Sequence, residues 1–244
     1  MPVYFVATHP NINIAKTITH AFSYISKQPI DKKSQIIILS DRIIQKLEQN
    51  INNLYDIKNI SNIKYEDFLW NHCISEEFKD FSIPDKIDFY TTQELMDSNS
   101  KVHQNALTYM TSIITNNSEN RTAHLIIGSG GLGKTSLCQS LAHRLKRHND
   151  KFLTIYISSE DIRKYIAENH LPFNNVDNIF DLYQMEAKYL EHHNIFDKKT
   201  FELSILTGKI VTIIDGLDEF SSIFSDKFNI YNFLKSIHEI NKQL

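Results

Sequence analysis

The sequence predicts an α/β protein with parallel strands, because short apolar runs alternate with segments of helical periodicity. Two observations carry this prediction. Gln35-Ile36-Ile37-Ile38-Leu39 is an uninterrupted run of the kind found in strands that are buried on both faces. Four of the six glycines in the 244 residues fall within residues 128–135, between an apolar run and a helical pattern.

The first part of the chain, residues 1–95, is predicted to be a small parallel α/β domain. Its function is unknown, and its position before the second domain is that of an effector or adaptor. Val3-Tyr4-Phe5-Val6-Ala7 predicts a strand, and apolar residues spaced from Ile14 to Ile25 predict a helix. With the strand at 35–39 they form a βαβ unit, for which a right-handed crossover is expected. Three further elements are expected here: a helix capped by Asp41, a helix from Phe68 to Phe78, and a short strand at 87–90.

The polar stretch Asp97-Ser98-Asn99-Ser100 is expected to open a helix with Val102, Ala106 and Met110 on one face. We place a domain boundary near residue 95, so that residues 96–244 form the second domain. One continuous sheet through both parts is the alternative.

The glycine-rich window fits G-x-x-x-x-G-K-[ST], the phosphate-binding loop (Walker A motif) of proteins that use nucleoside triphosphates. Backbone N–H groups converge on a triphosphate, and side chains with a Cβ would block that approach. The following helix directs its positive end at the anion. The predicted nucleotide-binding residues are Gly128, Ser129, Gly130, Gly131, Leu132, Gly133, Lys134 and Thr135.

The surroundings of the window favour this interpretation. His124-Leu125-Ile126-Ile127 predicts a buried parallel strand before the loop, and a helical pattern from Leu137 to Leu145 follows it. Residues 152–157 predict another strand, and Ser158 with Asp161 forms a plausible helix cap. Further elements are expected in order: helices at 160–169, 177–195 and 199–206, then a buried strand at 209–214.

That last strand ends in Asp215-Gly216-Leu217-Asp218-Glu219. An apolar strand that ends in aspartate (a Walker B motif) is the expected partner of a phosphate loop, because its carboxylate positions Mg²⁺ directly or through water. Thr135 and Asp215 are therefore the predicted metal residues.

The two motifs together, G-S-G-G-L-G-K-T and D-G-L-D-E after four apolar residues, resemble the NACHT group of STAND ATPases. These are nucleotide-controlled signalling switches of innate-immunity receptors and bacterial antiphage proteins, and the likeness covers about residues 100–240. The resemblance implies ATP and Mg²⁺ as cofactors. It also implies that Asp218 or Glu219 polarises the attacking water, and the sequence does not choose between the two catalytic candidates.

The chain departs from the family after Asp215. In the family's sheet, a further strand lies between the phosphate-loop strand and the Asp215 strand, but residues 220–244 offer only a helical pattern. The missing strand would leave a gap of about 10 Å and unpaired backbone groups. We therefore expect an NTPase domain that is incomplete at its C-terminal end. The chain is expected to be the front part of a larger switch, as a truncated fragment, or one half of a split protein that self-association or a partner chain completes, and we doubt that it hydrolyses ATP alone.

Bulk composition excludes several classes of protein. The net charge of −3 argues against general coating of nucleic acid, although a local basic site stays open. Cys73 and Cys138 lie far apart, so neither a disulfide framework nor a zinc site is indicated. The start of the chain lacks a signal-peptide pattern and no apolar run reaches 18 residues, so we expect a cytoplasmic protein without a membrane segment.

Other candidate residues are interpreted as structural. Ligands of parallel sheets bind beyond the carboxyl ends of strands, which directs attention to Thr8, His9, Ser40 and Asp41, but ordinary turn residues explain them. Asp56-Ile57-Lys58 is too short a pattern to indicate a nuclease. His192-His193 is expected to be exposed to solvent.

Three functions follow from these motifs. The first is a signalling switch in which binding of ATP and Mg²⁺ changes assembly and thereby activates the amino-terminal domain. The second is an AAA+-like ATPase acting on nucleic acid, against which the intervening Gly216 argues. The third is a non-hydrolysing interaction module.

Overall fold

The fold is described from a computed structural model, which covers residues 3–7, 14–25, 27, 35–40, 60–74, 83, 90–116, 123–148, 151–169, 175–192 and 196–242. The chain divides into two compact units, Met1–Cys73 and Ile74–Leu244. Both units combine helices with parallel strands, so the predicted α/β class is confirmed.

The first unit is a three-stranded parallel sheet in the order β1-β2-β3. Its elements in chain order are β1 (Val3–Ala7), α1 (Ile14–Ile25), β2 (Gln35–Ser40), β3 (Ile60–Lys64) and α3 (Tyr65–His72). The predicted βαβ unit is confirmed by β1, α1 and β2. Residues Ile18, Phe22 and Ile25 of α1 recur at helical spacing, and they pack into one core with Val6, Ile36 and Ile38 of the strands.

In the first unit, the structure differs from the sequence-based prediction at several elements. The strand β3 was not predicted, because Ile60-Ser61-Asn62-Ile63-Lys64 lacks a continuous apolar run. Its neighbour α3 ends at His72 instead of continuing to Phe78, which lies outside the described residues. The helix expected after Asp41 and most of the strand expected at 87–90 also lie outside them. Tyr90, the last residue of that expected strand, is in no strand.

The second unit contains a parallel pair of strands, β6 (Leu153–Ser158) and β7 (Ile210–Asp215), and a two-stranded antiparallel hairpin, β4 (Leu95–Met96) with β5 (Val102–His103). Register pairing runs from Leu153 with Ile210 to Ser158 with Asp215. The helices are α5 (Ala106–Asn116), α6 (Lys134–Lys146), α7 (Ser159–Asn169), α8 (Ile179–Tyr189), α9 (Lys198–Leu206), α10 (Phe220–Phe224) and α11 (Ile230–Lys242), with a 3₁₀ turn at Ser225–Lys227.

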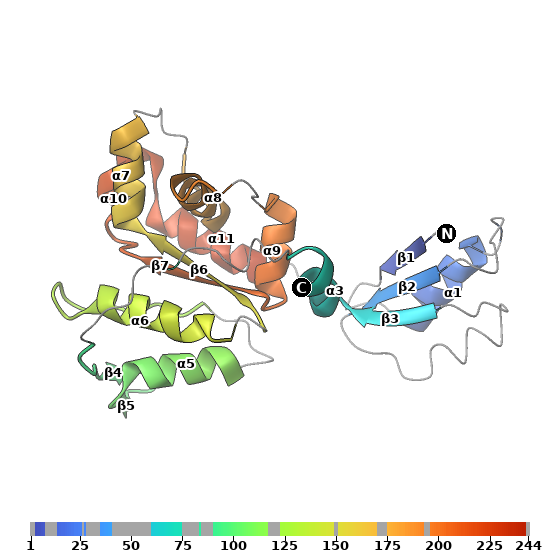
Figure 1. Cartoon of the computed structure of the whole chain (residues 1–244), viewed down its shortest axis with the longest axis horizontal. Helices are drawn as coiled ribbons and strands as arrows, with labels where there is room; N and C mark the ends of the chain where they lie inside the picture. The colour runs from blue at the N-terminus through green and yellow to red at the C-terminus, as the bar shows by residue number, and fades with distance from the viewer. Residues whose placement is uncertain are drawn as a thin grey trace. The chain divides into compact units, whose positions relative to one another are not determined.

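Helices cover both faces of the β6–β7 pair (Figure 1). On one face, α6 contacts both strands and α5 packs against α6. On the other face, α7 and α8 contact β6, α9 contacts β7, and α11 packs against α8 and α9. Because apolar layers lie on both sides, all six residues of β6 are buried, as its continuous apolar sequence predicts.

The expected strand at 124–127 is wrong. Residues 123–129 adopt no regular secondary structure, and β7 pairs only with β6 among the described residues. A strand requires a neighbour to bond its backbone, so an apolar run alone does not make one. Ile126 still packs against the core between α6 and the strands, whereas Leu125 is 59% exposed and Ile127 is 85% exposed.

The hairpin replaces the expected start of a helix at 97–100. The Asp97 carboxylate accepts the backbone N–H groups of Asn99 and Lys101, which closes a turn between β4 and β5. Helix α5 begins at Ala106 instead, and the Asn105 side chain accepts the Thr108 N–H there. The units divide after Cys73, about twenty residues before the predicted boundary. Residues 90–96 belong with the second unit, whose core includes Leu95.

Candidate nucleotide-binding site

The phosphate-loop motif joins the irregular segment 123–127 to helix α6, which begins at Lys134. Gly133, just before the helix, has φ +77°, a left-handed conformation that disfavours a side chain. The Lys134 ammonium donates to the carbonyl oxygens of Gly128 at 2.7 Å and Ser129 at 3.1 Å. The Lys134 ammonium group therefore lies over its own loop. A bound phosphate would compete with the Gly128 and Ser129 carbonyls for the N–H donors of this group.

The two predicted metal residues meet. The Thr135 hydroxyl donates to Asp215 Oδ1 at 3.3 Å, although 80 positions separate them in the sequence. This contact brings the first turn of α6 against the end of β7. The register of β6 and β7 sets the same edge, because Ser158 lies beside Asp215.

Hard oxygen ligands at this separation fit Mg²⁺. Two neighbouring oxygens in an octahedral shell with bonds of about 2.1 Å lie about 3 Å apart, close to the observed distance. The described residues contain no group of three or more His, Cys, Asp or Glu side chains that would hold a metal without help. Mg²⁺ suits such a sparse site, since it keeps waters and shares itself with substrate phosphates. Thr135 and Asp215 would supply its protein ligands.

Tyr156 completes the Asp215 environment and was not predicted. Its hydroxyl donates to Asp215 Oδ2 at 2.9 Å in a buried position. Burial and the neighbouring carboxylate raise the pKa of Tyr156, so the phenol keeps its proton and remains a donor. Burial, with Asp215 nearby, also raises the pKa of Cys138 to about 12, which makes that thiol unreactive.

The turn after Asp215 separates the two candidate catalytic residues. Glu219 Oε2 accepts hydrogen bonds from Ser159 Oγ at 3.0 Å and Arg163 Nη2 at 2.9 Å, both in α7. Gly216 has φ +74°, and a methyl group added there would collide with Ser159 Oγ. Asp218 is exposed to solvent, as Glu219 is, but no hydrogen bond or ion pair joins its carboxylate to another described residue. The Glu219 carboxylate is thus committed to α7, and the Asp218 carboxylate is accessible.

Gln93 is a second contact that the sequence did not suggest. Its side-chain amide donates to the carbonyl oxygens of Leu132 at 3.2 Å and Gly133 at 2.8 Å. No local pattern marks a single glutamine 35 residues before the motif. Ser159 had a weak signal, because it lies between the strand predicted at 152–157 and the helix predicted at 160–169. Arg163 had none.

The remaining candidate residues lie elsewhere. Ser40 is fully buried and accepts a hydrogen bond from Asn62 Nδ2 at 2.7 Å, which makes it structural. His192 is half-buried, whereas the sequence predicted that it is exposed to solvent. Thr8, His9, Asp41, Asp56, Lys58 and His193 lie outside the described residues.

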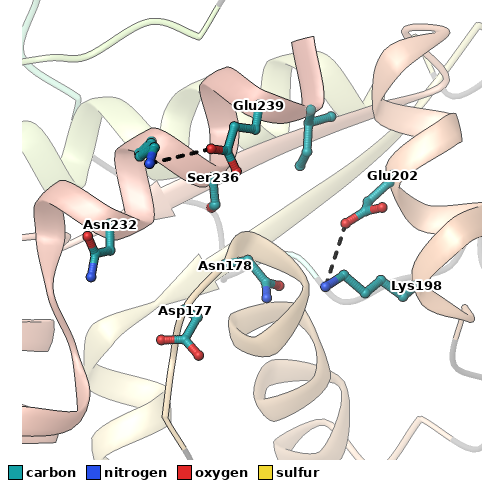
Figure 2. Close-up of a pocket in the computed structure, with 9 residues that line it drawn as sticks. Asp177, Asn178, Lys198, Glu202, Asn232, Ser236 and Glu239 are labelled. Carbon is teal, nitrogen blue, oxygen red and sulfur yellow. Dashed lines mark ion pairs between the residues drawn. The ribbon is translucent and has the colours of Figure 1, made fainter. Parts of the chain in front are cut away.

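A separate cavity of about 460 Å³ lies between the start of α8 and helices α9 and α11 (Figure 2). Its two lysines pair along their own helices, Lys198 with Glu202 and Lys235 with Glu239, and Asp177 adds a further carboxylate to the lining. The Asn178 side chain also occupies two backbone N–H groups at the start of α8. Because both lysines are paired, these N–H donors are used and three carboxylates line the cavity, it lacks the chemistry of a phosphate site.

No helix among the described residues is both long and apolar enough to cross a membrane. No protein-family model, curated protein or solved structure matches the chain. The assignment of a function therefore depends on the geometry of the loop and the Asp215 edge.

Proposed function

We propose that the chain is a nucleotide-dependent switch that binds ATP with Mg²⁺ and couples nucleotide binding to assembly. The contact between the Thr135 hydroxyl and the Asp215 carboxylate carries this proposal. Two motifs separated by 80 positions would have no reason to meet at 3.3 Å if they were an unrelated glycine-rich turn and an acidic turn. Their resemblance to NACHT-type switches supports a signalling role in the cytoplasm, where ATP is found.

The roles of the individual residues follow from their chemistry. Backbone N–H groups of the loop would bind the phosphates, and the Lys134 ammonium would neutralise the β- and γ-phosphates. Bound Mg²⁺ would supply electrostatic stabilisation of the terminal phosphate. Because Ser159 and Arg163 hold Glu219, we assign the polarisation of an attacking water to Asp218.

We further propose that a strand from a second polypeptide, a copy of this chain or a partner protein, inserts between segment 124–127 and β7. Leu125 and Ile127 are exposed apolar side chains, and β7 has one edge without a partner strand among the described residues. An apolar strand laid there would bond both backbones and cover those side chains. Nucleotide bound at the adjoining loop would favour or oppose this insertion.

Binding of a fluorescent ATP analogue with Mg²⁺ tests the proposed function. Lys134→Ala should weaken binding at least tenfold, because the charge facing the phosphates is lost. Lys146→Ala, at the exposed far end of the same helix, is the matched control and should bind as the wild type does. Equal affinity in Lys134→Ala, or binding unaffected by removal of Mg²⁺, would reject the proposal.

A light-scattering measurement of molar mass, with and without ATP and Mg²⁺, tests the coupling to assembly. Ile127→Lys replaces an 85%-exposed side chain, so it should leave folding intact and abolish any nucleotide-dependent change in mass. A mass that changes equally in this variant would place the interface elsewhere. If self-association fails in the wild type, the strand must come from a different protein.

A non-enzymatic interaction module, whose incomplete site binds nucleotide weakly or not at all, is the second candidate function. The observation that favours it is the pair of hydrogen bonds that hold Glu219 to α7, together with segment 123–129, which forms no strand. Thermal unfolding with and without ATP and Mg²⁺ separates the two functions. A ligand at 100 times its dissociation constant adds about 2.7 kcal/mol of stability, whereas a module that does not bind nucleotide shows no shift.

A further inference from the structure

We propose that Gln93 is a positioning residue of the phosphate loop, which sets the direction of the backbone N–H groups that receive the phosphates. The inference rests on the proposed nucleotide binding and extends it to a residue outside both motifs. Its starting observation is the pair of hydrogen bonds from the Gln93 amide to the Leu132 and Gly133 carbonyls.

The chemistry of the amide fixes its orientation. Carbonyl oxygens only accept hydrogen bonds, so the –NH₂ group must face the loop. The amide oxygen then faces away, and the Tyr90 hydroxyl lies 3.5 Å from it. One –NH₂ group serves two adjacent peptide units, at 2.8 Å and 3.2 Å. Of the twenty side chains, only Gln and Asn present this double donor on a neutral, flat group.

Peptide geometry converts these two bonds into a direction for the loop amides. In a trans peptide the C=O and the N–H point in opposite directions. The Leu132 carbonyl shares its peptide with the Gly133 N–H, and the Gly133 carbonyl shares its peptide with the Lys134 N–H. Gln93 therefore bonds both carbonyls on one side, and both N–H groups face the other. The Gly133 carbonyl also accepts the Leu137 N–H at 2.9 Å, so the helix and Gln93 together direct the Lys134 N–H, and Gln93 directs the Gly133 N–H. Those two N–H groups stand at the start of α6, where a bound phosphate gains most from the helix dipole.

Gln93 is itself fixed to the framework. Its backbone carbonyl accepts the Ala106 N–H at 2.8 Å, at the first residue of α5. Helix α5 packs against α6, and Arg144 of α6 donates to the Thr108 hydroxyl at 3.2 Å. Gln93, which bonds the loop, is thus connected through α5 to α6, the helix that follows the loop.

Gly133 shows how closely Gln93 approaches. A methyl group added to Gly133 would collide with Gln93 Nε2, and the φ of +77° disfavours a side chain independently. Glycine at this place is usually explained by the approach of phosphate. Here the opposite side of the same residue is filled by Gln93, so the requirement for glycine comes from both sides.

The test uses the full chain and a fluorescent ATP analogue with Mg²⁺. Gln93→Leu keeps the bulk and removes both donors, and it should weaken binding about tenfold or more. Gln104→Leu, an exposed glutamine between β5 and α5, is the matched control and should not change the affinity. Far-UV circular dichroism and the thermal midpoint establish that the variants are folded.

The pH dependence of nucleotide binding by Gln93→Glu distinguishes a positioning role from a purely structural role. At pH 8 its carboxylate faces two carbonyl oxygens and repels them, so binding should be weaker than in Gln93→Leu. As pH falls to 4.5, near the ordinary glutamate pKa of about 4.3, a growing share of the carboxyls is protonated and regains one O–H donor, so the affinity relative to the wild type at the same pH should begin to recover. This pH profile should be absent from both leucine variants.

The outcomes are distinguishable. If the wild type fails to bind, the proposed function is wrong and the role of Gln93 is rejected with it. If the wild type binds and Gln93→Leu binds equally, only the positioning role is overturned. If Gln93→Leu does not fold, a Gln93→Glu affinity that runs parallel to the wild type across pH overturns it instead.

Discussion

Glu186 offers the sharpest quantitative prediction of this structure. Its side chain is 2% exposed in the middle of α8, and its Oε2 atom has no hydrogen-bond partner among the described residues. Burial raises the pKa of Glu186 to about 8, and the nearby Asp161 carboxylate adds to the effect. A backbone hydrogen bond with Ser158 acts in the opposite direction. The folded protein therefore holds this carboxyl protonated at neutral pH.

The sign of the pH dependence follows from linkage. Between the ordinary pKa of 4.5 and the folded value of about 8, the folded state holds a proton that the unfolded state releases. Stability is therefore lost as pH rises through this window. At about 1.4 kcal/mol per pKa unit, the shift amounts to about 5 kcal/mol in total, of which about 3 kcal/mol falls between pH 5 and pH 8.

Glu186→Gln removes the titration and keeps the shape. The amide adds donors that also lack partners, at a cost of about 1–3 kcal/mol, so the absolute stability of the variant is not the informative quantity. This cost does not depend on pH. The difference in unfolding free energy between variant and wild type should therefore grow by about 3 kcal/mol in favour of the variant from pH 5 to pH 8.

Urea unfolding followed by far-UV circular dichroism measures this difference. Trp70, the single tryptophan, belongs to the first unit, so its fluorescence reports separately on a region that the substitution should not affect. Glu168→Gln, at an exposed position of α7, is the matched control and should follow the wild type at every pH. A constant difference between Glu186→Gln and wild type across this range would refute the reasoning.

Two further predictions concern the Asp215 edge. Tyr156→Phe leaves a buried carboxylate oxygen of Asp215 without its donor, so it should lower the unfolding free energy by about 1–3 kcal/mol, and a urea midpoint within error of the wild type would contradict this. Gly216→Ala and Gly208→Ala both place a methyl group at positive φ, but only the first collides with a side chain, that of Ser159, while the second meets open space. Both should lose about 1–2 kcal/mol in urea unfolding from backbone strain, and the additional loss in Gly216→Ala measures the collision, so equal losses would show that Ser159 moves aside.

Elements that carry their signal locally could be predicted from the sequence. The strands β6 and β7 have continuous apolar sequences because helices cover both of their faces. The apolar residues of α1 recur at helical spacing because one side of this helix packs against the sheet. The phosphate loop and Asp215 follow from residue types that their chemistry restricts. The meeting of Thr135 with Asp215 was expected from the two motifs together and is observed.

Features that depend on distant partners could not be predicted. The run 124–127 has the composition of a strand, but pairing is decided by whether another strand lies beside it. Gln93 and Arg163 are ordinary polar residues, and only the fold brings them to Gly133 and Glu219, across 40 and 56 positions. The β4–β5 hairpin is formed by pairs of residues too short to show a period, and side-chain bonds from Asp97 make its turn.

The contacts at the site come from both faces of the β6–β7 pair, and this bears on how a switch would work. Gln93 approaches the loop from the side of α5, whereas Ser159 and Arg163 approach the Asp215 turn from α7, on the opposite face of the strands. Mg²⁺ held by Thr135 and Asp215 would join these two sides, because one ligand belongs to α6 and the other to β7. Any movement of the phosphate loop would therefore be passed to the turn that carries Asp218 and Glu219. The exposed pair of Arg163 and Glu219 contributes at most about 1 kcal/mol. That is small enough for the proposed nucleotide binding to offset, and full release of Glu219 from α7 would also break its hydrogen bond from Ser159.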